Sequence, residues 1–299
     1  MLSLLLSTAA CPSDIDLGFV ELGWFKVIVL GIVQGITELL PISSTAHLRI
    51  IPALLGWKDP GSAFSAAMQL ASIAAVISYF WYDLKKMTGA TVRAISEQNY
   101  LDRYFRLAVG VLVGTIPICI SGLLLKKTLN ACNSPFRTLA VVGLASIVMS
   151  LLLAIAEKIG NRDRDFNQLS WKDGIWVGIS QALALIPGVS RSGSTLTSGL
   201  FLGMERETAA RFSFLLGLPA VVLAGALELH TLFKAGLNLN GWITLIIGLI
   251  TASLSAFAAI YGLLRYLEKH STWVFVWYRF VMGIFLLIGI TAGFLSDRV

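Results

Sequence analysis

Residues 34–47 read QGITELLPISSTAH, and residues 187–195 read PGVSRSGST. Each stretch places proline, several hydroxyl residues and an ionisable residue between two apolar segments. These segments are too short, or too interrupted, for a bilayer span of about 20 residues, and they cover about 22–40, 46–57, 172–186 and 194–204. Irregular backbone at membrane depth is tolerated only where it is buried in protein or lines a wet cavity. We therefore predict two re-entrant hairpins that can build one site.

The composition is that of an integral membrane protein. Of the 299 residues, 56% are hydrophobic and only 13% are charged, and the mean hydropathy is +0.79. A soluble core of this size does not need so much apolar surface. Disordered, fibrous and nucleic-acid-binding classes are therefore excluded, and we attribute the net charge of +6 to cytoplasmic loops rather than to a nucleic-acid partner.

The rest of the chain divides into two halves of the same plan. Pairs of similar landmarks (Gln34 and Gln181, Pro41 and Pro187, Phe64 and Phe212) lie 146 to 148 residues apart, which favours an internal duplication over a coincidence between two Ala/Leu-rich stretches. Each half would hold one hairpin and three spans. The six predicted spans are 62–82, 107–125, 138–156, 209–232, 242–264 and 273–295.

An odd number of crossings in each half would invert the second half relative to the first. We therefore predict an all-α integral membrane protein, one membrane domain over 1–299, with two inverted-topology repeats at about 20–160 and 165–299. Thirteen basic residues fall on one side and seven on the other, which predicts that the first side is cytoplasmic. The cytoplasmic loops would be 83–106, 157–173, 205–211 and 265–272.

Ionisable residues at membrane depth are costly, so each is a candidate for function. They are Glu38, His47, Arg49, Arg191 and Arg279. Arg279 follows Trp277 and Tyr278, and this aromatic neighbourhood favours an anchor at the membrane surface.

Two groups in the first break suggest chemistry. Gln34 and Glu38 lie one helical turn apart, and their oxygens suit Mg²⁺ or Ca²⁺; the alternative is that Glu38 only forms an ion pair with an arginine. Ser43, Ser44 and Thr45 precede His47. A hydroxyl near an imidazole is the arrangement of an activated nucleophile, although at least one of these residues would serve as an ordinary helix cap.

The second break is suited to phosphate. Its glycines allow successive N–H groups to point inward at a helix N-terminus, and Arg191 adds a guanidinium that matches phosphate oxygens. Its hydroxyl donors are Ser190, Ser192, Ser194 and Thr195. The alternative is a flexible turn in which Arg191 neutralises Glu38. Together, the two breaks predict an enzyme that acts on a lipid phosphate or diphosphate.

On these two motifs the chain resembles the undecaprenyl-diphosphatase (UppP/BacA, bacitracin resistance) family. Residues 34–47 are similar to its E/Q-x-x-x-E and P-x-S-S-T-x-H elements, and residues 187–195 to its P-G-x-S-R-S-G element. The resemblance implies hydrolysis of undecaprenyl diphosphate to undecaprenyl phosphate and inorganic phosphate, which recycles the lipid carrier of peptidoglycan synthesis. It also implies a divalent cation, Mg²⁺ or Ca²⁺, a homodimer among membrane lipids, and a bacterial plasma-membrane site open to the outer face.

The resemblance also assigns roles by motif position. The catalytic residues would be Glu38, Ser44, His47 and Arg191, with the choice of Ser44 or His47 as nucleophile left open. The phosphate-binding residues would be Ser43, Thr45, Ser190, Arg191 and Ser192, and the metal-binding residues Glu38 and Gln34. Two positions depart from the commoner pattern. Gln34 is the uncharged one of the two residues that the first motif position allows, which leaves one carboxylate where an acidic pair would have two, and Ala46 stands where glycine is commoner. The main alternative function is a flippase or transporter for a lipid phosphate, which needs phosphate ligands but no nucleophile.

Overall fold

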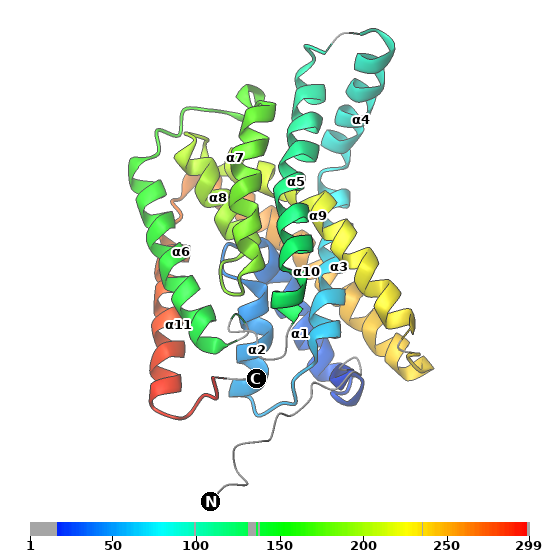
Figure 1. The fold of residues 1–299 in the computed structure, drawn as a ribbon, viewed down its shortest axis with the longest axis vertical. Helices are drawn as coiled ribbons and strands as arrows, with labels where there is room; N and C mark the ends of the chain where they lie inside the picture. Colours follow the sequence, from blue (N-terminus) through cyan, green and yellow to red (C-terminus); the bar gives the residue numbers. More distant parts are fainter. Residues whose placement is uncertain (1–16, 99, 131–135, 137, 235, 298–299) are drawn as a thin grey trace, which may run out of the picture.

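A computed structural model describes residues 17–98, 100–130, 136, 138–234 and 236–297. Over these residues the fold is all helical and contains no strand, only an isolated bridge between Arg164 and Met204. The helices are α1 (Trp24–Leu39), α2 (Ser44–Leu54), α3 (Ser62–Tyr79), α4 (Trp81–Ser96), α5 (Arg103–Asn130), α6 (Leu139–Ile159), α7 (Trp171–Ala182), α8 (Arg191–Phe201), α9 (Arg206–Lys234), α10 (Leu239–Lys269) and α11 (Trp273–Thr291). Figure 1 shows them as one bundle.

Five helices of the described chain are long and apolar enough to cross a membrane, namely α5, α6, α9, α10 and α11. The span expected over 62–82 corresponds to α3, whose apolar part, Ala67–Tyr79, is shorter than a full span. Since a spanning helix needs about 20 residues and five helices meet this length, the chain is a multi-pass membrane protein.

Both predicted hairpins are interrupted where the sequence indicated. The helix α1 ends at Leu39 and α2 begins at Ser44, so the first break covers only residues 40–43. In the second hairpin α7 gives way to a short 3-10 turn, Leu183–Leu185, and α8 begins at Arg191. None of these four helices exceeds 16 residues, so each is shorter than the span of about 20 residues that a full crossing needs.

The predicted cytoplasmic loop over 83–106 is wrong in part, because α4 occupies residues 81–96. This helix buries Met87, Ala90 and Ala94, which lie on one face at helical spacing, and it packs on α5. The charged residues of this segment lower its mean hydropathy, so its narrow apolar face is not recognised in a search for apolar spans. In Figure 1 the two helices extend together beyond the rest of the bundle at the top of the view.

Glycines allow the first helix of each hairpin to pack closely on a long helix of the other half. The helix α1 lies against α10, and α7 lies against α5. A methyl group at Gly178 would meet the carbonyl oxygen of Gly114 at 2.1 Å, and one at Gly35 would meet the carbonyl oxygen of Ala252 at 2.3 Å. Side chains at these positions would separate the helices, so these contacts fix the depth and direction of both hairpins.

Buried carboxylates join the helix ends on the side with the excess of basic residues. Glu157, at the end of α6, accepts hydrogen bonds from Arg162, Arg206 and Thr272. Asp173, in α7, accepts two bonds of 2.9 Å from the guanidinium of Arg164. Since a buried carboxylate must be paired to be tolerated, these contacts tie α6, α7, α9 and the start of α11 together.

Candidate active site

The two breaks, more than 140 residues apart in sequence, meet in the interior. Ser192, at the start of α8, donates its hydroxyl to the carbonyl oxygen of Leu40 at 3.0 Å. Arg191 donates from Nη2 to Oε1 of Glu38 at 3.3 Å, so the ion pair that the sequence left as an alternative is formed. The hairpins therefore build one site from both halves of the chain.

Glu38 is the centre of this site. Its Oε2 accepts a hydrogen bond of 2.6 Å from the hydroxyl of Ser44 and one of 3.1 Å from the amide of Gln34, and its Oε1 faces Arg191. Its side chain is 7% exposed. Because Glu38 lies in the last turn of α1 and Ser44 begins α2, the tight turn between these helices brings carboxylate and hydroxyl together. A carboxylate in this position can orient the hydroxyl and receive its proton.

Ser43 and Ser190 hold matching positions in the two breaks. Each precedes the first residue of a helix, α2 or α8, and each has a left-handed backbone, with φ of 73° and 70°. Non-glycine residues in this region cost about 1–3 kcal/mol and cluster at functional sites. The conformation lets both helices begin at the site, and helix N-termini attract anions.

The breaks open into a cavity of about 340 Å³. Its polar wall consists of Glu38, Ser43, Ser44, Thr45, Gln69, Ser190 and Arg191. Its apolar wall comes from α5, α9 and the first residues of the second break, namely Ile118, Ala184, Leu185, Ile186, Ala220, Val221 and Ala224. A ligand with an anionic head and an apolar tail matches such a division, and this apolar wall was not foreseen from sequence.

His47 does not form the hydroxyl–imidazole pair expected from the sequence. Its Nδ1 donates to the carbonyl oxygen of Ser43 at 2.7 Å, and its Nε2 accepts from the hydroxyl of Tyr278 at 2.5 Å. Because α2 begins at Ser44, His47 lies in the first turn of this helix. Its imidazole therefore forms a hydrogen bond with the carbonyl oxygen four residues earlier in the chain. Ser44 is bonded to Glu38 instead, while a role for His47 in the reaction stays a prediction.

Arg279 is not the surface anchor that its aromatic neighbours suggested. It is 1% exposed, and its guanidinium donates to the carbonyl oxygens of Pro41, Gly188 and Val189 at 2.8–3.0 Å. A buried charge needs several polar partners, and the breaks of both hairpins supply them. No local pattern could reveal these partners, because they are about 90 and 238 residues away in sequence.

The other predicted hydroxyl residues of the second break form hydrogen bonds with the protein itself. Ser194 and Thr195 donate to the carbonyl oxygen of Arg191, as serine and threonine often do within helices. Ser192 is buried and does not line the cavity. Its predicted contact with phosphate would require it to leave the carbonyl of Leu40. Ser190 and Arg191 are therefore the two residues of this break whose side chains are best placed to meet an anion.

The donors available for a metal are few and all are oxygens. Among the described residues, no three His, Cys, Asp or Glu side chains gather in a group that could hold an ion. The predicted pair is nevertheless adjacent, and Oε1 of Gln34 is buried without a hydrogen-bond partner. Nε2 of Gln34 is the atom that faces the carboxylate, but an amide oxygen without a partner and a carboxylate one helical turn apart are the kinds of ligand that fit Mg²⁺ or Ca²⁺, with phosphate and water as the others.

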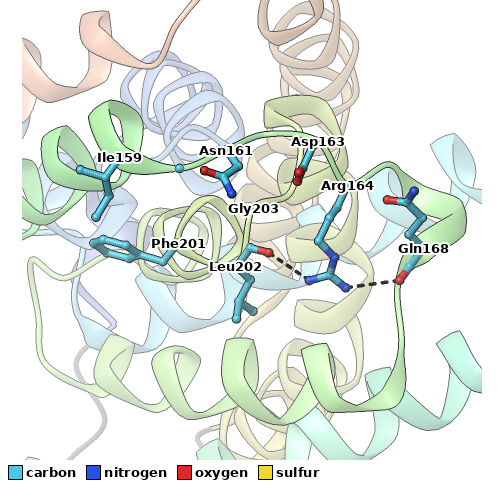
Figure 2. Close-up of a pocket in the computed structure, with 9 residues that line it drawn as sticks. Ile159, Asn161, Asp163, Arg164, Gln168, Phe201, Leu202 and Gly203 are labelled. Atoms are coloured by element: carbon cyan, nitrogen blue, oxygen red, sulfur yellow. Dashed lines mark hydrogen bonds between the residues drawn. The ribbon is translucent and has the colours of Figure 1, made fainter.

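A second cavity of about 620 Å³ lies where α6 and α8 end (Figure 2). Its central charged group, Arg164, donates to the carbonyl oxygens of Leu202 and Gln168, as Figure 2 shows, and to Asp173. None of the residues predicted for the site lines this cavity. Those predicted site residues that line a cavity therefore line the smaller one, between the hairpins.

The chain is similar to known proteins over most of its length. The family model described as bacitracin resistance protein BacA matches residues 27–285. The undecaprenyl-diphosphatase of Trichormus variabilis is 53% identical over 290 residues, which cover 97% of this chain and 91% of that protein. The undecaprenyl-diphosphatase 2 of Mesorhizobium japonicum is 57% identical over 263 residues, which cover 88% of this chain and 100% of that protein.

Proposed function

The chain belongs to the bacitracin resistance protein BacA family, and we propose that it hydrolyses undecaprenyl diphosphate to undecaprenyl phosphate and inorganic phosphate. The reaction recycles the lipid carrier of peptidoglycan synthesis and fits bacitracin resistance. The observation that carries this proposal is the hydrogen bond between Ser44 and Glu38 beside Arg191, in a cavity with one polar and one apolar wall.

Ser44 is the proposed nucleophile. Its oxygen attacks the terminal phosphorus while its proton passes to Oε2 of Glu38, and the bond from that phosphorus to the bridging oxygen breaks. Undecaprenyl phosphate leaves and the phosphoryl group stays on Ser44. The departing phosphate oxygen takes the proton from Glu38, which becomes a carboxylate again. This carboxylate then deprotonates a water molecule that attacks the phosphoserine, and it returns the proton to Oγ of Ser44 as the bond between Oγ and phosphorus breaks, which gives inorganic phosphate and the free hydroxyl. The 2.6 Å contact between Ser44 and Glu38 supports this division of roles over one in which His47 is the base.

Arg191 and the helix starts would stabilise the charge that develops on the phosphoryl oxygens. A guanidinium presents several N–H donors in a plane that matches these oxygens, and preorganised donors act most strongly in a water-poor cavity. Ser43, Thr45 and Ser190 add hydroxyls to the same polar wall. Glu38 holds Arg191 in place before the substrate arrives.

A divalent cation, Mg²⁺ or Ca²⁺, is part of the proposal. Glu38 and Gln34 would hold it, because their side chains are in contact and Oε1 of Gln34 has no hydrogen-bond partner. When bound, such an ion offsets negative charge on a diphosphate. The amide of Gln34 accepts no proton, so Glu38 alone serves the acid–base role.

We also propose that the two halves are inverted repeats in the bacterial plasma membrane. Support comes from the reciprocal packing of α1 on α10 and α7 on α5, and from the equivalent left-handed backbones of Ser43 and Ser190. The excess of basic residues on the opposite side favours a cavity open to the outer face. The proposal includes the homodimer that the family resemblance implies, which light scattering of the detergent-solubilised protein would test.

The test of the function is phosphate release from undecaprenyl diphosphate by purified protein in detergent. We expect release with Mg²⁺ or Ca²⁺, loss of release with EDTA, and loss of release in Glu38→Ala. Arg211→Lys is a suitable control, because Arg211 pairs with Asp83 away from the cavity. Folded protein that releases no phosphate but moves a lipid phosphate across liposomes would contradict the proposal and favour a flippase.

A further inference from the structure

Arg279 stands on α11, outside both hairpins, yet its guanidinium contacts the backbone of both breaks. Nη1 donates to the carbonyl oxygen of Pro41 at 3.0 Å. Nη2 donates to the carbonyl oxygens of Gly188 and Val189 at 2.8 and 2.9 Å. A planar guanidinium presents its donors in fixed directions. These three bonds therefore set the position of one break relative to the other.

This arginine carries a charge that no acid balances. Among the residues that the structure describes, no carboxylate forms an ion pair with Arg279. A buried charge held only by carbonyl dipoles is costly in a membrane protein. Gly188, one of its partners, lines the cavity, so the charge lies just behind the wall where we propose that a diphosphate binds. The positive charge of Arg279 would stabilise an anion bound in the cavity. This benefit gives a reason for burying an arginine here, whereas a purely structural contact would not need the charge.

Tyr278, the residue before Arg279 on α11, acts on the first break through His47. The hydroxyl of Tyr278 donates to Nε2 of His47 at 2.5 Å, and the two rings stack with centroids 5.6 Å apart. The other nitrogen of His47 donates to the carbonyl oxygen of Ser43. Ser43 has the strained left-handed backbone that starts α2. Tyr278 therefore acts, through His47, on the residue next to Ser44.

We propose that Tyr278 and Arg279 are positioning residues of the reaction. Together they hold the two breaks so that Ser44 and Arg191 face the same phosphorus atom. This inference rests on the proposed function. No residue of α11 lines the cavity, so the helix would set the geometry of the reaction without touching the substrate.

The experiment measures kcat and KM for phosphate release with two conservative variants, Arg279→Lys and Tyr278→Phe. Lysine keeps the charge but cannot reach three carbonyls in fixed directions, and phenylalanine keeps the ring stack but loses the hydroxyl. A displacement of about 1 Å costs about 100-fold in rate. We therefore expect kcat to fall about 100-fold in Arg279→Lys, with KM within about threefold of wild type. The loss of one hydrogen bond predicts a fall of about fivefold to tenfold in Tyr278→Phe.

Matched controls come from α10, where Arg265 and Tyr261 are exposed. Arg265→Lys and Tyr261→Phe should leave both constants unchanged. Rates are expressed per folded protein, at a temperature well below the unfolding midpoint of every variant. A residue that only stabilises the fold would then leave kcat unchanged.

The inference is overturned if wild type is active and kcat of Arg279→Lys stays within about threefold. It is also overturned if only KM rises, because that result would indicate substrate binding rather than positioning. If Arg279→Lys fails to fold, the comparison of Tyr278→Phe with Tyr261→Phe decides, and equal rates reject the inference. A folded wild type without phosphate release would instead reject the proposed function, and this inference with it.

Discussion

Gly217, on α9, makes room for the guanidinium of Arg191. A methyl group at Gly217 would lie 1.4 Å from Nη1 of Arg191, whereas ordinary contacts begin at 3.4 Å. Gly217→Ala must therefore displace the guanidinium by about 2 Å. The contact of 3.3 Å between Arg191 and Glu38 does not survive a shift of that size. Since about 1 Å of misplacement costs about 100-fold in rate, we expect kcat for phosphate release to fall at least 100-fold.

The folded state should tolerate this change. The displaced atoms are the end of a flexible side chain, and alanine favours a helix over glycine by about 1 kcal/mol. Thermal unfolding in detergent should therefore remain a cooperative transition, with a midpoint only several degrees lower because the buried ion pair is lost. Gly89→Ala on α4 is the matched control, because its methyl group would meet Nη1 of Arg93 only at 3.9 Å. A Gly217→Ala variant with wild-type kcat would refute the placement of Arg191 as the phosphate-binding arginine.

Three further substitutions test the nucleophile, the metal ligands and the packing of the helices. Ser44→Ala should lower kcat at least about 1000-fold in the phosphate-release assay, and a loss below about tenfold would exclude Ser44 as nucleophile. Gln34→Glu should lower the concentration of Mg²⁺ or Ca²⁺ for half-maximal activity about tenfold, because a second carboxylate joins Glu38; an unchanged or higher concentration would contradict the metal assignment. Gly178→Ala should destabilise the fold by about 1–3 kcal/mol and lower the unfolding midpoint by several degrees, because its methyl group would meet the carbonyl oxygen of Gly114 at 2.1 Å. Gly262→Ala, with no atom within 4 Å, should show no such loss.

The breaks were predictable from sequence because their composition conflicts with their surroundings. Proline, hydroxyls and charge between short apolar segments have few explanations in a membrane protein. The contact of Glu38 with Arg191 was also open to prediction, because a membrane interior leaves buried charges few other partners. The reaction class followed from the same residues, together with the family resemblance.

Contacts that depend on tertiary placement were not predictable in the same way. Trp277 and Tyr278 made Arg279 look like a surface residue, and its carbonyl partners lie in distant segments. The spacing from Ser44 to His47 suggested a catalytic pair, but the start of α2 at Ser44 directs the imidazole back to Ser43. In both cases the sequence identified the important residue and the backbone determined its partner.

The amphipathic helix α4 illustrates another limit. Its apolar face, with Met87, Ala90 and Ala94, is narrow and its other residues are largely polar. A search for apolar spans passes over such a segment, although the helical spacing of its buried residues was present in the sequence. Helices with a narrow apolar face need the periodicity argument rather than the hydropathy argument.

The central claim, that Ser44 attacks the phosphorus, is tested most directly by the stereochemistry of the reaction. The substrate would be undecaprenyl diphosphate whose terminal phosphorus is made chiral with sulfur and oxygen isotopes, hydrolysed in isotopically labelled water. Transfer to Ser44 followed by hydrolysis involves two in-line displacements, so we predict thiophosphate with retained configuration. Inverted configuration would mean that water attacks in a single step, and it would contradict the assignment of Ser44 as nucleophile.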